Sequence, residues 1–184
     1  MGKNVFITGA SRGIGYETAL AFANKGFDIG FSYVQNDEKA DILGEKLSEI
    51  GVNSYKFKAD ASNYKTMEEV IDDYMSKVRK IDVLVCNAGI SSYGTITDMS
   101  VEEIQRTIET NIYSVIYTCK LVSPYMISQK FGSIVNMSSM WGIVGASCES
   151  IYSGGYNRIF KVTGKGTWTF KYQSQCACPG CGND

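Results

Sequence analysis

Apolar positions in the first 150 residues alternate between two spacings, one typical of strands and one typical of helices. Short apolar runs, each expected to form a buried strand, occupy five stretches: 5–8, 28–34, 55–59, 83–86 and 132–137. Between them, apolar residues recur every three or four positions, as in a helix that buries one face. The predicted helices cover 13–25, 38–50, 64–78 and a long stretch from a capping box at 100–103 to Met126.

Strands that alternate with helices favour βαβ units, in which neighbouring strands run parallel. The run Val83–Cys86 is apolar throughout, as expected for a strand covered on both faces. The predicted fold class is therefore α/β, a doubly wound parallel sheet of the Rossmann-like type. No further strand pattern follows the fifth run, so we expect the sheet to be truncated after its fifth strand.

The pattern changes after residue 152. Residues 153–184 contain neither Leu nor Met, and four basic residues against one acidic residue give them a charge of +3, whereas residues 1–152 carry −4. No helical or strand period persists there. We therefore predict one domain over 1–152, followed by a tail over 153–184 that does not continue it.

Composition excludes several classes of protein. The 184 residues suffice for one domain, and a net charge of −1 leaves no basic excess for binding nucleic acid. The absence of histidine excludes Ser-His-Asp and Cys-His nucleophiles. No apolar run approaches the roughly 18 residues that span a bilayer, and the N-terminus lacks a signal-peptide pattern. We expect a cytoplasmic protein with free thiols that binds neither nucleic acid nor membrane.

Three cysteines cluster near the C-terminus, at Cys176, Cys178 and Cys181. Such clustering is typical of metal sites. A fourth ligand would have to come from elsewhere, such as Cys148, and no histidine is present to supply it. We predict no metal.

A glycine-rich segment with the sequence TGASRGIG, residues 8–15, lies between the first predicted strand and the first predicted helix. Gly9, Gly13 and Gly15 permit a tight turn and allow backbone amides to approach a diphosphate at the positive end of the helix. The segment therefore favours nucleotide binding over an ordinary surface turn.

This segment is followed along the chain by further motifs in the order in which they occur in a known family, and the chain thereby resembles the short-chain dehydrogenases/reductases. The motifs are TGASRGIG (8–15), KAD ending at Asp60, CNAG (86–89), TNIYSV from Thr110 and VNMSSMWG (135–142), followed by Tyr152. The resemblance implies that 1–152 is a dinucleotide-binding domain and that 153–184 is an aberrant tail outside the family pattern.

The resemblance also implies a bound nicotinamide dinucleotide. Asp60 would accept a hydrogen bond from the adenine amino group. The other residues expected at the cofactor are Gly9, Ser11, Arg12, Gly13, Ile14, Gly15, Asn87, Ala88 and Gly89. The second predicted strand ends at Ser32 or Tyr33 with no acid before Asp37, and Arg12 is available for a 2′-phosphate, so we expect NADPH.

Three residues match the catalytic positions of the family. There, a tyrosine protonates the carbonyl oxygen, a serine positions the carbonyl group and an asparagine supports a water. The resemblance assigns these roles to Tyr152, Ser139 and Asn111. A lysine four residues after the tyrosine lowers the pKa of the phenol in the family, but Tyr156 stands there, so we expect impaired activity.

Within the family, the sequence looks most like reductases of 3-oxoacyl thioesters carried on acyl carrier protein in fatty acid synthesis. The stretch SSMWGIVGASCE (138–149) also resembles the reductase of the aminopentanone modification on elongation factor P. A non-catalytic dinucleotide-binding remnant is a third interpretation. The family is usually homo-oligomeric, but we expect this chain to lack much of that interface.

The tail itself suggests a frameshift. Back-translation of residues 160–183 with a shift of one base permits SKSLAKELGPSNIKVNALAPGVVT, which is similar to the expected family continuation. We therefore predict that the tail is out of frame, after a small deletion near Gly154 and Gly155 that also removes the lysine. The gene sequence tests this prediction directly.

Overall fold

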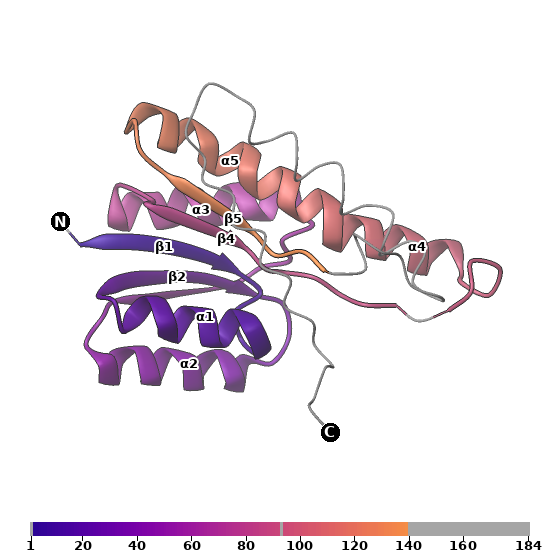
Figure 1. Ribbon diagram of the computed structural model, residues 1–184, viewed down its shortest axis with the longest axis horizontal. Coiled ribbons are helices and arrows are strands. Elements are labelled where there is room, and N and C mark those ends of the chain that lie inside the picture. The colour runs from indigo at the N-terminus through magenta and orange to yellow at the C-terminus, as the bar shows by residue number, and fades with distance from the viewer. Residues whose placement is uncertain (1, 93, 140–184) are drawn as a thin grey trace.

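The computed structural model describes residues 2–92 and 94–139, which form a parallel sheet with helices on both faces (Figure 1). The strand order is β3-β2-β1-β4-β5. The strands are β1 (Lys3–Thr8), β2 (Phe27–Tyr33), β3 (Ser54–Lys58), β4 (Val83–Cys86) and β5 (Ser133–Asn136). This confirms the predicted doubly wound α/β class. The predicted truncation after the fifth strand and the tail over 153–184 concern residues outside the described ones.

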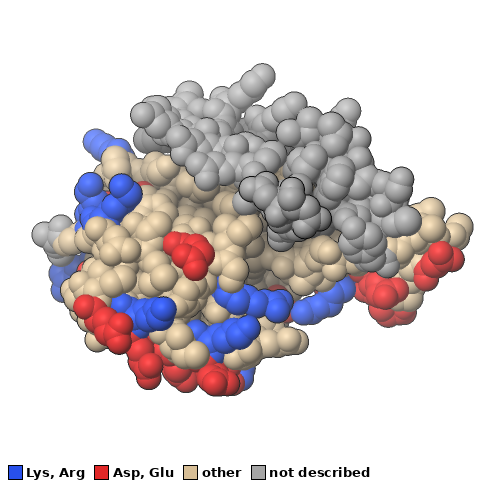
Figure 2. Space-filling model, turned by 60° about the horizontal axis from the view of Figure 1, so that its bottom comes forward, with Lys and Arg blue, Asp and Glu red and all other residues tan. Residues whose placement is uncertain are grey.

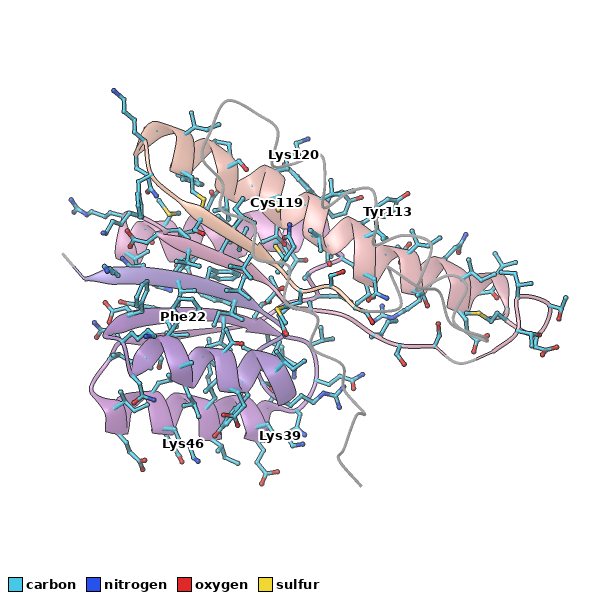
Figure 3. The ribbon with its side chains drawn as sticks, in the orientation of Figure 1. Phe22, Lys39, Lys46, Tyr113, Cys119 and Lys120 are labelled. Atoms are coloured by element: carbon cyan, nitrogen blue, oxygen red, sulfur yellow. The ribbon has the colours of Figure 1, made fainter. Side chains whose placement is uncertain are left out.

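Two layers of helices cover the sheet. Helices α1 (Gly13–Ala23) and α2 (Asp37–Ile50) pack on one face, and α3 (Tyr64–Val78) and α5 (Ser114–Ser128) pack on the other (Figure 1). Helix α4 (Val101–Ile108) precedes α5 and extends past the carboxyl ends of the strands. In Figure 3, Cys119 lies on the sheet-facing side of α5, whereas Lys120 lies on its outer side.

The core consists of two clusters separated by the sheet, and β1 contributes to both. Val5 and Ile7 pack toward α1 and α2, while Phe6, between them, packs toward α3 and α5. All three side chains are fully buried. Alternate residues of a strand point to opposite faces, so a central strand covered twice must be apolar at successive positions. This explains why the strands appear in the sequence as continuous apolar runs.

The predicted long helix is interrupted. A π-helical segment, η1 (Glu109–Tyr113), separates α4 from α5, although the sequence pattern continues through it. Such segments insert an extra residue into a turn and are frequent at functional sites. The interruption lies at Asn111, one of the predicted catalytic residues.

Tyr74 of α3 is buried beneath β2, where a glycine leaves space for its ring. Its hydroxyl group donates a hydrogen bond to the Val5 carbonyl at 3.1 Å. A Cβ atom at Gly30 would lie 2.6 Å from the Tyr74 ring and 2.9 Å from Phe6 Cδ2. Glycine is therefore required at position 30 by the close approach of two aromatic rings.

We expect Gly30→Ala to destabilise the chain by about 1–3 kcal/mol, because both rings are held in a close-packed core. Gly44→Ala is the matched control, since a Cβ atom there meets only Ser54 Oγ, at 4.0 Å, on a helix surface. The control should stabilise by about 0.5–1 kcal/mol. Urea unfolding of the whole chain measures both, and equal stability of the two variants would contradict this packing.

Candidate functional site

The strand order places a crevice at the carboxyl edge of the sheet. From β1 the chain proceeds to α1 on one face, whereas from β4 it proceeds toward α4 and α5 on the other. The strands β1 and β4 are adjacent, and the segments that follow them leave toward opposite faces of the sheet, so these segments diverge and leave a gap between them. In doubly wound sheets, ligands bind where neighbouring strands diverge in this way.

Glycines are required in the loop after β1 for two different reasons. Gly9 and Gly13 have φ angles of 69° and 58°, which strain other residues. Gly15 is required by space, because a Cβ atom there would lie 2.5 Å from Asn87 Nδ2 and 2.7 Å from the Gly9 carbonyl oxygen. The loop can therefore pack closely against the segment after β4.

Hydrogen bonds lock these two segments together. The Thr8 hydroxyl oxygen accepts from the backbone N–H groups of Asn87 and Ala88, both at 3.0 Å. The side-chain amide of Asn87 donates to the carbonyl oxygens of Thr8 and Gly9, also at 3.0 Å. Thr8 is 2% exposed. The sequence prediction included Asn87 but assigned no role to Thr8, although this residue opens the glycine-rich motif.

A cavity of about 580 Å³ opens above these loops, within the size range of ligand pockets. It brings together all the predicted cofactor residues except Gly15, which packs beneath the loop. Those that line it are Gly9, Ser11, Arg12, Gly13, Ile14, Asp60, Asn87, Ala88 and Gly89. Further lining residues that were not predicted as cofactor contacts include Val34, Gln35, Asn36, Ile90, Arg106 and Thr110.

At the β2 side of the cavity, an acidic side chain is held by two partners. Asp37 accepts hydrogen bonds from Lys58 Nζ at 2.6 Å and from the Tyr33 hydroxyl group at 2.9 Å. These bonds, that from Lys58 above all, lower the pKa of the Asp37 carboxyl group. Tyr33 and Asn36 line the cavity, whereas Asp37 is not among its lining residues.

Asp60 lies near the start of the loop between β3 and α3. Its Oδ1 atom accepts from the Ser62 N–H group at 2.9 Å and from the Ser62 hydroxyl group at 2.7 Å. Its Oδ2 atom accepts from Arg106 Nη2 at 3.3 Å. Burial raises the pKa of Asp60, but the hydrogen bonds from Ser62 and the charge of Arg106 outweigh it and hold this pKa below its usual value. The carboxylate is therefore ionised and fixed in direction.

Asn111 connects the π-helical segment to the loop after β4. Its Oδ1 atom accepts from the Ile90 N–H group and its Nδ2 atom donates to the Ile90 carbonyl, both at 2.8 Å. The residue is 1% exposed. Its amide group is thus paired with one backbone unit and fixes the segment that follows Gly89. The predicted role of Asn111 in supporting a water stays a prediction.

Ser139 follows β5 at the same edge of the sheet. The last pair in the register of β4 and β5 is Cys86 with Asn136, and the Met137 N–H group donates to the Cys86 carbonyl at 2.9 Å. Ser139 is 2% exposed. Tyr152 and Tyr156, together with Cys148 and the cysteines of the tail, lie outside the described residues.

Comparison with known proteins identifies the family. A sequence model described as short chain dehydrogenase matches residues 3–162. The chain belongs to the short-chain dehydrogenase family. The matched stretch runs past Tyr152 into the predicted tail.

Several relatives of this chain are known by sequence. A 3-oxoacyl-[acyl-carrier-protein] reductase of Staphylococcus epidermidis is 33% identical over 152 residues, which cover 83% of this chain and 62% of the relative. An uncharacterized oxidoreductase of Bacillus subtilis is 38% identical over 154 residues, with the same coverage of both chains. The chain thus spans about 62% of the length of these curated relatives.

Solved structures share the fold. The structure of NAD+-bound xylitol dehydrogenase matches with a TM-score of 0.82 and 28% identity, covering 88% of this chain and 62% of that one. A short-chain type dehydrogenase/reductase from Mycobacterium marinum matches with a TM-score of 0.81 and 29% identity, covering 88% and 66%.

The surface of the chain carries both positive and negative side chains. Figure 2 turns the lower side of Figure 1, where α2 lies, toward the viewer. Acidic side chains gather along the lower edge of this face, and basic side chains lie nearer its middle.

Among residues 2–92 and 94–139, no group of three or more metal-ligating side chains is found. No helix in these ranges has the length and apolar character to cross a membrane.

We expect Asn111→Asp to destabilise the chain by about 1–3 kcal/mol, because a carboxylate oxygen would replace the amide donor that faces the partly buried Ile90 carbonyl. Gln105→Glu makes the same amide-to-acid change at an exposed position of α4 and serves as control. Urea unfolding compares them, and an Asn111→Asp variant as stable as the control would show that the pairing with Ile90 is unimportant.

Proposed function

We propose that this short-chain dehydrogenase is a cytoplasmic reductase that uses NADPH to reduce the carbonyl group of 3-oxoacyl thioesters on acyl carrier protein. The observation that carries the proposal is the loop after β1, held open at the N-terminus of α1 by the hydrogen bonds between Thr8 and Asn87. The relatives named 3-oxoacyl-[acyl-carrier-protein] reductase support the substrate class.

The loop geometry suits a diphosphate. The first N–H groups of a helix lack partners within the helix, and the helix dipole adds positive potential at this end. Helix α1 begins at Gly13, and its N-cap residue, Arg12, makes no side-chain capping bond. Ser11, Gly13 and Ile14 line the cavity beside it. We assign the diphosphate to this end, and a nicotinamide ribose to the neighbouring segment Asn87, Ala88 and Gly89.

The charges at the end of β2 favour NADPH over NADH. An acidic residue at this position would bind the 2′-hydroxyl group of NADH and repel the 2′-phosphate of NADPH. Here the acidic side chain nearest to the strand end, Asp37, is paired with Lys58 and Tyr33. Arg12 lines the same cavity and supplies a positive charge. We therefore place the 2′-phosphate between Arg12 and Asn36.

The catalytic assignment uses Ser139, Tyr152 and Asn111. When bound, the reduced nicotinamide supplies the hydride that the carbonyl carbon accepts. Ser139 orients the carbonyl oxygen by donating a hydrogen bond, and the Tyr152 hydroxyl group gives this oxygen the proton that completes the alcohol. Asn111 holds the loop after Gly89 in place through Ile90. No metal has a part in this assignment.

A second candidate function is a dinucleotide-binding remnant that no longer turns over. It is favoured by Tyr156, which stands where the family has the lysine that lowers the pKa of the catalytic phenol. The reference pKa of a tyrosine is about 10, so without a nearby cation little of the phenolate forms at neutral pH. Both candidates share the same cofactor site.

We expect Arg12→Ala to weaken NADPH binding by about 10–100-fold and NADH binding much less, because a charge-assisted hydrogen bond to the 2′-phosphate is lost. Titration followed by nicotinamide fluorescence measures both affinities. Arg79→Ala is the control, since Arg79 is the C-cap residue of α3 at the opposite edge of the sheet. Equal losses for both cofactors would contradict the placement of the 2′-phosphate.

We expect the whole chain to oxidise NADPH slowly when acetoacetyl thioester is added, and Ser139→Ala to lower this rate by about 100-fold or more without changing NADPH affinity. Absorbance at the nicotinamide band follows the reaction. NADPH binding without any turnover by the native chain would favour the remnant, and no NADPH binding would refute both candidates.

A further inference from the structure

Arg106 lies on α4, outside the short motifs that carry the family resemblance in the sequence, yet it lines the same cavity as Asp60. Its guanidinium group is 3.3 Å from the Asp60 carboxylate. Asp60 belongs to the loop after β3, and 46 positions separate the two residues in sequence. The pair therefore joins two elements at the mouth of the cavity.

The Asp60 carboxylate is held by three donors. Two come from Ser62 and fix Oδ1, and the third, from Arg106, fixes Oδ2. A carboxylate oxygen can accept about two hydrogen bonds. Among the described residues, Oδ2 accepts from Arg106 alone, so it retains capacity for another donor from the cavity. Because Arg106 occupies one accepting position of Oδ2, it sets the direction from which another donor can approach this oxygen.

Helix α4 depends on few contacts with the rest of the described structure. Thr107 is its buried residue, and its hydroxyl group lies 3.0 Å from that of Ser92. Its other side chains are mostly exposed, and the helix projects beyond the sheet (Figure 1). The contact between Arg106 and Asp60 is therefore one of the few that connect α4 to the sheet.

We propose that Arg106 is a positioning residue for the adenine end of the cofactor, which holds Asp60 Oδ2 toward the adenine amino group and closes this end of the cavity from α4. The inference rests on the proposed dinucleotide function and adds to it a residue from α4. Arginine suits this place because its planar guanidinium group can pair with a carboxylate while facing an aromatic ring.

The alternative is an ordinary surface ion pair. The Arg106 side chain is 53% exposed, and exposed pairs of this kind contribute little to stability. Such a pair would leave cofactor affinity unchanged when broken. The two interpretations therefore differ in binding and not in folding, and binding is what the test measures.

The test compares Arg106→Met, Arg106→Lys and the control Arg79→Met in the whole chain, with NADPH and with reduced nicotinamide mononucleotide, which lacks the adenosine half. We expect Arg106→Met to weaken NADPH binding about fivefold to tenfold, and Arg106→Lys to recover part of the loss. The Arg106 variants should bind the mononucleotide as the native chain does, and the control should bind both ligands as the native chain does.

A double-mutant cycle tests whether Arg106 acts through Asp60. In an Asp60→Ala background, we expect Arg106→Met to have less than about a twofold further effect on NADPH affinity. Unchanged NADPH affinity in Arg106→Met, an equal loss in the Asp60→Ala background, or a similar loss for the mononucleotide would each overturn the inference. Failure of the native chain to bind NADPH would instead refute the proposed function, and the inference with it.

Discussion

The candidate site depends on one interaction, the hydrogen bonding between the ends of β1 and β4. The buried Thr8 hydroxyl oxygen accepts from two backbone N–H groups of the loop after β4, and the Asn87 amide returns two bonds to the loop after β1. Backbone groups buried at a strand end must find partners, and here each loop supplies those of the other. The divergent exits of two adjacent strands are thereby fixed as one rigid floor.

The close contact between the two loops explains why glycine is required at two positions of the glycine-rich segment after β1. Any side chain at Gly15 would displace Asn87, and a Cβ atom at Gly9 would lie 2.9 Å from Ala88 Cα. The two loops can approach each other only because these positions have no side chain. Above the floor, the cavity is lined by a charge pair on the α4 side, Asp60 with Arg106, while Asp37 pairs with Lys58 outside the lining, beyond Tyr33 and Asn36 on the β2 side. The pairing fixes where a ligand would meet negative charge.

Much of the fold could be predicted from sequence, because strand and helix periods depend on burial that is local to each element. The glycine-rich loop could be predicted for the same reason, since the glycines that permit its conformation all lie within residues 9–15. The π-helical segment was missed because the apolar spacing continues through it, and only the Ile90 backbone reveals why Asn111 sits there. Arg106 and the Tyr33–Asp37–Lys58 contacts were missed because they join elements whose contact depends on the fold, with no signal in spacing. The roles of Ser139 and Tyr152 came from family resemblance alone, and Tyr152 lies outside the described residues.

The most direct test of the central claim is an amide NMR titration of the isotope-labelled whole chain with NADPH. If the locked loop at the start of α1 holds the diphosphate, the largest shifts will fall on the N–H groups of Gly13, Ile14 and Gly15, with smaller shifts at Ala88 and Gly89. Saturable binding that leaves these amides unmoved and shifts others elsewhere would contradict the account.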